Sequence, residues 1–369
     1  MLTTLQSTGS VLCVKSVPSV DTLQYFSNTS IYTSNAGQPG GGCGISKDGQ
    51  IMVVGRTSTT GSTVLINYSN DGGVTWQFAS HPNANSIGAL YFRDSNICLA
   101  GGAPSAGQMP FFCADLSGPS ASFANNTGAL SAAVRGLACA NDATTTSGIV
   151  YQGYQGFFKY STTGISTTVS TMGNHPLYTA GITDMDIDPD DANYAIISST
   201  VAGSTTGLYA ITPTYGKVAL ITGIGNLITS VSTCAGLTKC IVQTAGNTHL
   251  LTNINLQTGT LTRTQIATTA NTYGIIGAVG SGGLLDESCK SSMSLDGQII
   301  CVIDRNTGTN PNPHAYYSKN GGASFTSINT QFNLTNIVFL SCCVSRCDAG
   351  NNKYILLHST TGFYRLKIA

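Results

Sequence analysis

Two short segments of the chain recur at a nearly constant separation, and this duplication constrains the fold more than any other feature. The segment GISKDGQIMVVGR, residues 44–56, matches SMSLDGQIICVID, residues 292–304, which lies 248 residues later. In each copy a second match follows, YSNDGGVTW at residues 68–76 and YSKNGGASF at residues 317–325, now separated by 249 residues. Two matches that keep nearly the same separation indicate an internal duplication, which is typical of repeat-built folds.

Weaker units lie around the two copies, each starting with a short apolar or alternating strand. Their starts lie near Ser86, Val134, Ile182, Leu227, Ser291 and Ile337. Such spacing is typical of propeller blades built from four short strands. We therefore predict one β-propeller domain over residues 1–369 with seven four-stranded blades, six and eight being the alternatives. The expected blades span roughly residues 43–85, 86–131, 132–178, 179–225, 226–283, 284–332 and 333–369.

The final unit, residues 333–369, has room for only three strands. The N-terminal segment, residues 1–42, contains the strand-like runs SVLCVKSV and NTSIYTS and can supply a fourth. Pairing of the two chain ends would close the ring and remove free sheet edges. We expect this closure.

Composition supports an all-β chain. Charged residues make up 9% of the sequence, and the acids are fifteen Asp and a single Glu, Glu287. Scarcity of Glu and Lys removes the residues that best form exposed helix faces, whereas Ser, Thr, Asn and Gly suit strands and tight turns. The apolar fraction of 41% is enough for a packed core.

The charge balance excludes one class of partner. Sixteen basic and sixteen acidic residues give a formal net charge of zero, without any run of Lys and Arg that could neutralise phosphates. We expect no nucleic-acid binding. Near-neutrality also weakens repulsion between molecules, which favours packing against other protein subunits, including copies of the chain.

The beginning of the chain, MLTTLQSTGSVLCVKSV, lacks the basic and apolar regions of a signal peptide, and no apolar run is long enough to span a membrane. We expect neither a leader nor membrane insertion. A virion or other extracellular surface and the cytoplasm are the candidate locations.

Twelve cysteines are present, and their spacing matches no zinc motif. Most lie in apolar or strand-like stretches, where a thiol behaves as a small buried hydrophobe. We expect core thiols, with disulfides and metal ligation as the alternatives.

The repeated turn identifies a family resemblance. YSNDGGVTW resembles a full Asp-box of the bacterial neuraminidase repeat propellers, with Ser69, Asp71, Gly73, Thr75 and Trp76 at the motif positions. YSKNGGASF resembles a degenerate box, with Ser318, Asn320, Gly322, Ser324 and Phe325 at those positions. The resemblance implies a structural turn between the third and fourth strands of a blade, facing away from the ligand-binding end. The aspartate would accept backbone hydrogen bonds, and the aromatic ring would pack between sheets.

A second acidic segment raises the question of calcium. Asp184, Asp186 and Asp188 form a D-x-D-x-D pattern, but Pro189 and Ala195 stand where a calcium loop needs Gly and Glu. The favoured interpretation is a strand that ends in a turn, with the three acids on one face. Calcium is the alternative, and no other cofactor is expected.

No motif identifies an enzyme. A sialidase would need an arginine triad, a Tyr–Glu pair and an acidic Asp, yet the seven arginines lie in no matching motif and no Tyr lies near Glu287. A propeller of the xyloglucan-cleaving type would need paired carboxylates, for which the candidates are Asp94, Asp286, Glu287 and Asp304. The sequence favours a non-catalytic structural or interaction module, for example in a virion or surface structure. The alternative is a carbohydrate-active propeller that binds or cleaves glycans.

Overall fold

The computed structural model describes residues 20–27, 42–55, 64–80, 84–92, 96–104, 111–118, 124–125, 134–143, 147–154, 157–161, 181–200, 206–212, 216–224, 228–244, 248–266, 291–304, 314–337, 339–346, 353–359 and 361–369. Within these residues, helix is confined to the short 3-10 turn η1 (Ala235–Leu237) and to α2 (Ile328–Gln331). The prediction of an all-β chain is confirmed. Within the same ranges, no helix is long and apolar enough to cross a membrane.

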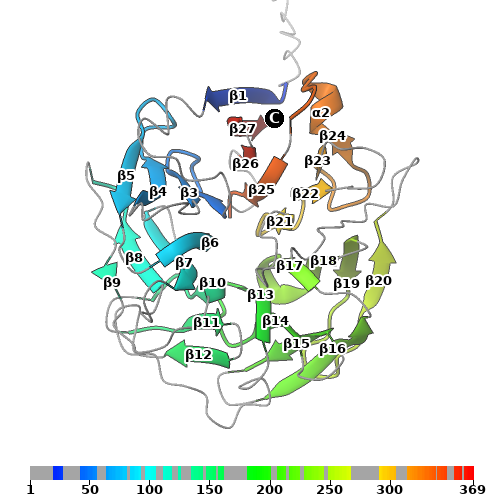
Figure 1. The fold of residues 1–369 in the computed structure, drawn as a ribbon. Coiled ribbons are helices and arrows are strands. Elements are labelled where there is room, and N and C mark those ends of the chain that lie inside the picture. The colour runs from blue at the N-terminus through cyan, green and yellow to red at the C-terminus, as the bar shows by residue number, and fades with distance from the viewer. Residues whose placement is uncertain are drawn as a thin grey trace, which may run out of the picture.

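The strands form antiparallel sheets that stand radially around a central axis, as in a β-propeller (Figure 1). Six sheets have four described strands each. In chain order these are β2 (Cys43–Ile45), β3 (Met52–Gly55), β4 (Val64–Ser69) and β5 (Gln77–Ser80); β6 (Ala84–Phe92), β7 (Ile97–Pro104), β8 (Phe111–Asp115) and β9 (Ala124–Asn125); β13 (Gly181–Ile187), β14 (Ala195–Thr200), β15 (Thr206–Ile211) and β16 (Lys217–Ile224); β17 (Ile228–Thr233), β18 (Lys239–Thr244), β19 (Thr248–Thr252) and β20 (Thr262–Gln265); β21 (Ser291–Met293), β22 (Ile300–Asp304), β23 (His314–Ser318) and β24 (Thr326–Ser327); and β25 (Phe339–Val344), β26 (Lys353–Ser359), β27 (Gly362–Ile368) and β1 (Thr22–Ser27).

A further sheet has three described strands, β10 (Val134–Cys139), β11 (Val150–Tyr154) and β12 (Phe157–Ser161). The chain that follows β12, residues 162–180, lies outside the described residues. Seven four-stranded blades were predicted, and six four-stranded sheets are found among the described residues. The six sequence-derived unit starts all lie in, or within two residues of, the first strand of a sheet.

The ring is closed by the two ends of the chain. Strand β1 pairs antiparallel with β27, from Thr22 opposite Lys367 to Ser27 opposite Gly362, and becomes the outer strand of the last sheet. The buried carboxylate of Asp21 reinforces the closure, because it accepts hydrogen bonds from the backbone N–H of Ala369 and from the Tyr317 hydroxyl. The closing strand therefore contacts both the end of the chain and the preceding sheet.

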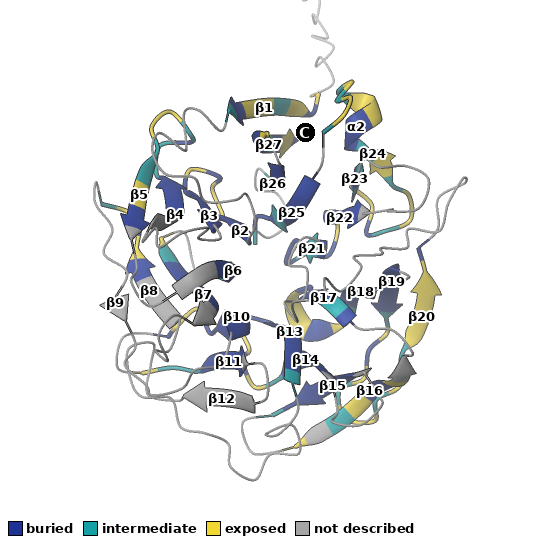
Figure 2. Cartoon of the chain, in the orientation of Figure 1, coloured by how far each residue is buried: buried dark blue, intermediate teal, exposed yellow. Residues whose placement is uncertain are grey.

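The core lies between neighbouring sheets, and exposed residues lie at the perimeter (Figure 2). Large side chains such as Tyr68, Tyr151 and Phe339 are fully buried there. Eight cysteines have described side chains; all eight are thiols rather than disulfides, and only Cys343 is not fully buried. For these eight, the expectation of core thiols is confirmed.

Candidate functional site

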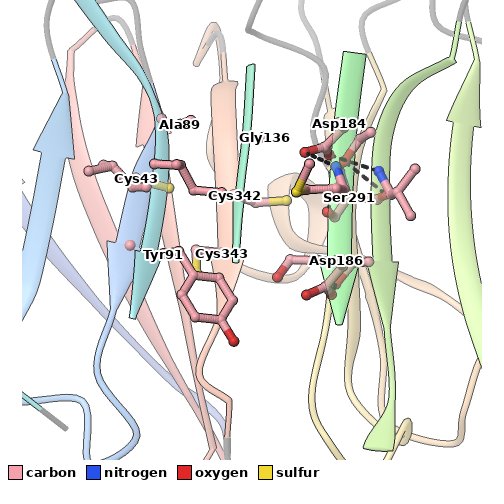
Figure 3. A pocket seen from close by; sticks show the side chains of 18 of the residues that line it. Cys43, Ala89, Tyr91, Gly136, Asp184, Asp186, Ser291, Cys342 and Cys343 are labelled. Carbon is pink, nitrogen blue, oxygen red and sulfur yellow. Dashed lines mark hydrogen bonds between the residues drawn. The ribbon is translucent and has the colours of Figure 1, made fainter. Parts of the chain in front are cut away.

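A cavity of about 100 Å³ lies at the centre of the propeller, and the first strands of all seven sheets line it (Figure 3). The lining includes Asp184 and Asp186 of β13, Arg135 of β10 and Arg346, which follows β25. Figure 3 shows Tyr91 across the cavity from the two aspartates. A cavity with several polar groups is where a ligand or a catalytic site is first sought, so the partners of these groups decide what it can do.

The three aspartates of the D-x-D-x-D segment, two in β13 and one directly after it, all point to the next sheet. Each accepts a hydrogen bond from the backbone of β17 or of the turn after it. The pairs are Asp184 with the N–H of Val231 at 2.8 Å, Asp186 with that of Thr233 at 2.8 Å, and Asp188 with that of Gly236 at 2.6 Å. The acids do share one face, and their function in the fold is to join two sheets by satisfying buried donors.

This geometry does not support the calcium alternative. The three carboxylates are spread along one strand and engage three separate backbone groups, instead of converging on one point. Among the described residues, no group of three or more His, Cys, Asp or Glu side chains could hold a metal ion. A calcium site needs six to eight converging oxygen ligands. Calcium at Asp184, Asp186 and Asp188 therefore stays the less favoured alternative to a strand that ends in a turn.

Arg346 is a part-buried charged group whose two Nη atoms are both hydrogen-bonded. Its Nη1 donates to Asp186 Oδ2 at 2.6 Å, and its Nη2 donates to the carbonyl of Ile187 at 2.7 Å. Burial acts to lower the pKa of Arg346, but the charge of Asp186, the nearby Tyr91 and the hydrogen bond to Asp186 together outweigh it, and the pKa is raised. The guanidinium therefore stays charged and connects the end of the last sheet to β13.

Serine side chains continue the same arrangement from β17 to β25. Each accepts a backbone N–H of the following first strand. The pairs are Ser230 with Ser291 at 3.0 Å, Ser232 with Met293 at 3.0 Å, and Ser292 with Val344 at 2.9 Å. Much of the polar lining of the cavity is thus engaged in holding neighbouring sheets together.

The first Asp-box forms the turn between β4 and β5, the third and fourth strands of their sheet. Both Asp71 oxygens accept from the Thr75 N–H at 2.9 Å, and Asp71 Oδ1 also accepts from the Ser69 hydroxyl at 2.8 Å. Gly72 and Gly73 have φ of 72° and 90°, which favours glycine. Burial acts to raise the pKa of Asp71, but the hydrogen bonds from Thr75 and Ser69 outweigh it and lower the pKa.

The second box reproduces these contacts with an amide in place of the acid. Asn320 Oδ1 accepts from the Ser324 N–H and from the Ser318 hydroxyl, each at 2.9 Å. Its Nδ2 donates to Ser324 Oγ at 2.8 Å, in the place of the Thr75–Asp71 contact. Gly321 and Gly322 have φ of 67° and 93°. The turn needs a side-chain acceptor at this position, and it does not need a negative charge.

The aromatic residue that ends each box packs on the preceding sheet. The Trp76 ring lies 5.9 Å from Phe26 of β1 and 5.8 Å from Phe363 of β27, centroid to centroid. Phe325 packs against the apolar cluster that includes Leu250 of β19. The resemblance implied rings between sheets, and both residues have this arrangement.

The equivalence of the two boxes gives a prediction. Asp71→Asn should lower the free energy of unfolding by less than about 1 kcal/mol, because the amide oxygen can still accept from Thr75 and Ser69. Asp71→Ala removes the acceptor and should cost about 2 kcal/mol. Chemical denaturation of the two variants checks this. Equal losses in both would show that the charge of Asp71 matters, contrary to the geometry.

A buried histidine on β19 gives the fold a pH dependence. Arg263 Nη2 lies 2.8 Å from His249 Nε2, and since arginine can only donate, Nε2 must accept as part of a neutral ring. Burial, followed by the charge of Arg263, lowers the pKa of His249 from 6.5 to about 4. The unfolded chain therefore binds this proton more readily than the folded chain.

We accordingly expect the stability contributed by neutral His249 to be complete above pH 6.5 and to fall as the pH drops from 6.5 towards 4. Denaturation of the wild type and of His249→Gln at several pH values would measure it. The difference in unfolding free energy between the two should shrink with acidification. A constant difference over this range would contradict the assignment.

Several candidates from the sequence cannot be placed. Asp94, Asp286 and Glu287 lie outside the described residues, and Asp304 ends β22 without a described side chain. His81 and His175 also lie outside, while His249, His314 and His358 lie on β19, β23 and β26 in three different sheets. Arg346 stands in no motif, so the sequence does not mark it as a site residue. Its only signal is its position, two residues after the apolar strand β25.

Neither a family model nor a curated protein matches the chain. Solved structures do match, and one of them is a crystal structure of Raptor from Chaetomium thermophilum, with a TM-score of 0.58 and 11% sequence identity. The match covers 90% of this chain but 28% of that one, so the chain spans less than a third of the length of that structure. At this identity the likeness concerns the fold alone, and it supports the β-propeller.

Proposed function

We propose that the chain is a non-catalytic β-propeller that acts as a structural or interaction module in an assembly. The observation that carries the proposal is the use of the central charged groups. Asp184 and Asp186 accept from the backbone of β17, and Arg346 is bound to Asp186 and Ile187. A catalytic acid or base must reach a substrate atom, and these groups are committed to joining sheets.

The proposal also covers the number of blades and the family to which the two repeated turns belong. The three-stranded sheet β10–β12 is a seventh blade, since β10 lines the central cavity together with the six other first strands. The two Asp-boxes are structural, because their residues make contacts within their own turns or with the preceding sheet. These residues are Ser69, Asp71 and Trp76 in the first box and Ser318, Asn320 and Phe325 in the second. This supports a place among the Asp-box propellers.

The partners proposed are other protein subunits, including copies of the chain, in a virion or another surface structure. Zero formal net charge and the absence of a basic run in the sequence support protein partners over nucleic acid. Native mass measurement of the intact chain, alone and in its native particle, tests the assembly role. An ordered assembly is expected.

One observation favours a second candidate, a carbohydrate-active propeller. Arg135 and Asp184 line the same cavity, and a carboxylate with an arginine can bind or hydrolyse an acidic sugar. The intact chain would be tested on a glycan array and with fluorogenic sialosides and xyloglucan fragments. We expect no turnover. Turnover that is lost in Asp184→Asn would overturn the non-catalytic proposal.

A further inference from the structure

The duplicated units differ at their outer edge, and this difference points to an interaction surface. Val74 in the first box and Phe78 on β5 are 80% and 63% exposed. The residues that align with them in the second copy are Ala323 and Ser327. Since both copies form the same turn, the fold does not require large apolar side chains at these positions. Their exposure in the first copy calls for another explanation.

The outer edges of the two copies differ: α2 follows the short outer strand of the second copy, whereas among the described residues no strand pairs with the outer edge of the first. Strand β24 has only two residues and leads directly into α2, where the Ser327 hydroxyl accepts the Thr330 N–H. Asn329 of this helix accepts the backbone N–H of Ala315 in β23, in place of a longer fourth strand. In the first copy, β5 runs for four residues and is the last strand of its sheet.

Strand β5 also lacks the charged side chains that, on the other long outer strands, oppose pairing with a second chain. The outermost described strands β12, β16 and β20 each contain a Lys or Arg, namely Lys159, Lys217 and Arg263. Beside β1, Arg365 donates to Gln24. The sequence of β5 is QFAS, without charge or proline, and it lies at the perimeter (Figure 2). Unprotected edges of this kind pair readily with another strand.

We propose that the edge of β5, together with Val74 and Phe78, is the contact surface between two copies of this chain related by a two-fold axis. Antiparallel pairing of β5 with its own copy uses the same residues on both sides, which is the condition for a closed two-fold contact. With a formal net charge of zero, the copies do not repel one another. This inference rests on the proposed assembly role and specifies one of its contacts.

The apolar side chains at this edge supply part of the area that a dimer contact needs. Val74 and Phe78 are both largely exposed, and together they present on the order of 200 Å². That is about a quarter of the roughly 800 Å² that each partner contributes to a standard interface. The paired β5 backbones and a polar rim would supply the rest.

The test is the oligomeric state of the full chain, measured by sedimentation and light scattering over a wide range of concentrations. We expect a dimer in the wild type. Phe78→Lys should raise the dimer dissociation constant by at least about tenfold. The double variant Val74→Ala/Phe78→Ser, which gives the first copy the residues of the second, should weaken the dimer without affecting the turn. As a matched control, Thr264→Lys adds the same charge to β20 and should leave the dimer unchanged.

Thermal melts of each variant establish that loss of the dimer does not reflect unfolding. If the wild type assembles and the β5 variants assemble equally well, the surface is wrong while the assembly role stands. If the wild type is monomeric at every concentration, the pairing is overturned. The assembly role is then decided separately, by the composition of the native particle and the glycan assays.

Discussion

Replacing Arg346 with methionine should lower the free energy of unfolding by about 3–5 kcal/mol, since it leaves a buried carboxylate without its cation. Asp186 is 5% exposed and would keep only its hydrogen bonds from Ile187, Ser232 and Thr233. Backbone N–H and hydroxyl donors stabilise a carboxylate, but they do not neutralise it. Equilibrium denaturation of Arg346→Met measures the loss.

Two further variants make this result specific. The double variant Asp186→Asn/Arg346→Met removes both charges of this pair and leaves neither without its partner, so the loss should be clearly smaller than the sum of the single losses. Lys319→Met also removes the cation paired with a buried carboxylate, Asp21, but the Lys319 side chain is 46% exposed. Solvent already screens this pair, so the loss should be at most about 1 kcal/mol. A loss of that small size for Arg346→Met would show that the central pair does not hold the ring together.

What could be predicted from the sequence was encoded locally. The Asp-box turns depend on contacts between residues two to four positions apart, such as Ser69 with Asp71 and Thr75 with Asp71. The duplicated DGQI turns do as well, with Ser46 bonded to Asp48 and Ser294 to Asp296 at 2.6 Å. Side-chain acceptors and glycines specify such turns without help from the rest of the chain. Five of the first strands, β6, β10, β13, β17 and β25, have a register shift against the second strand of their sheet. The sequence also marked the starts of these five strands as starts of repeat units.

What could not be predicted depends on how the ring closes. Arg346 meets Asp186 across 160 residues, and no local pattern marks either as the partner of the other. The D-x-D-x-D segment left calcium open as an alternative because acidic residues on one face have the same sequence pattern whether they bind a metal or backbone N–H groups. Only the position of β17 beside β13 distinguishes the two. The open edge of β5 was likewise invisible until the copies could be compared strand by strand.

Gly73→Ala should be the most damaging small substitution in either Asp-box, with a loss of about 3–5 kcal/mol. Gly73 has φ of 90°, and an added Cβ would lie 2.2 Å from Cε1 of Phe26 and 2.9 Å from Cε of Met52. Phe26 belongs to the closing strand β1 and stacks edge-on against Trp76. Relief of the clash therefore requires β1 to move, so the substitution should weaken the closure of the ring. Hydrogen exchange at the β1–β27 pairs should rise more than elsewhere.

The second box supplies the matched control for this substitution. Gly322 has φ of 93°, nearly that of Gly73, but its added Cβ would meet the end of the flexible Leu250 side chain at 2.9 Å. Gly322→Ala then carries the backbone strain with a smaller clash and should cost about 1–3 kcal/mol. Removing the obstructing ring should separate the two contributions, so Gly73→Ala should cost less in a Phe26→Ala background than in the wild type. If the two glycine variants lose equal stability and Phe26→Ala changes neither loss, backbone strain alone accounts for the loss in both turns. The clash between the new Cβ and Phe26 would then contribute nothing, and Gly73→Ala would not weaken the pairing of β1.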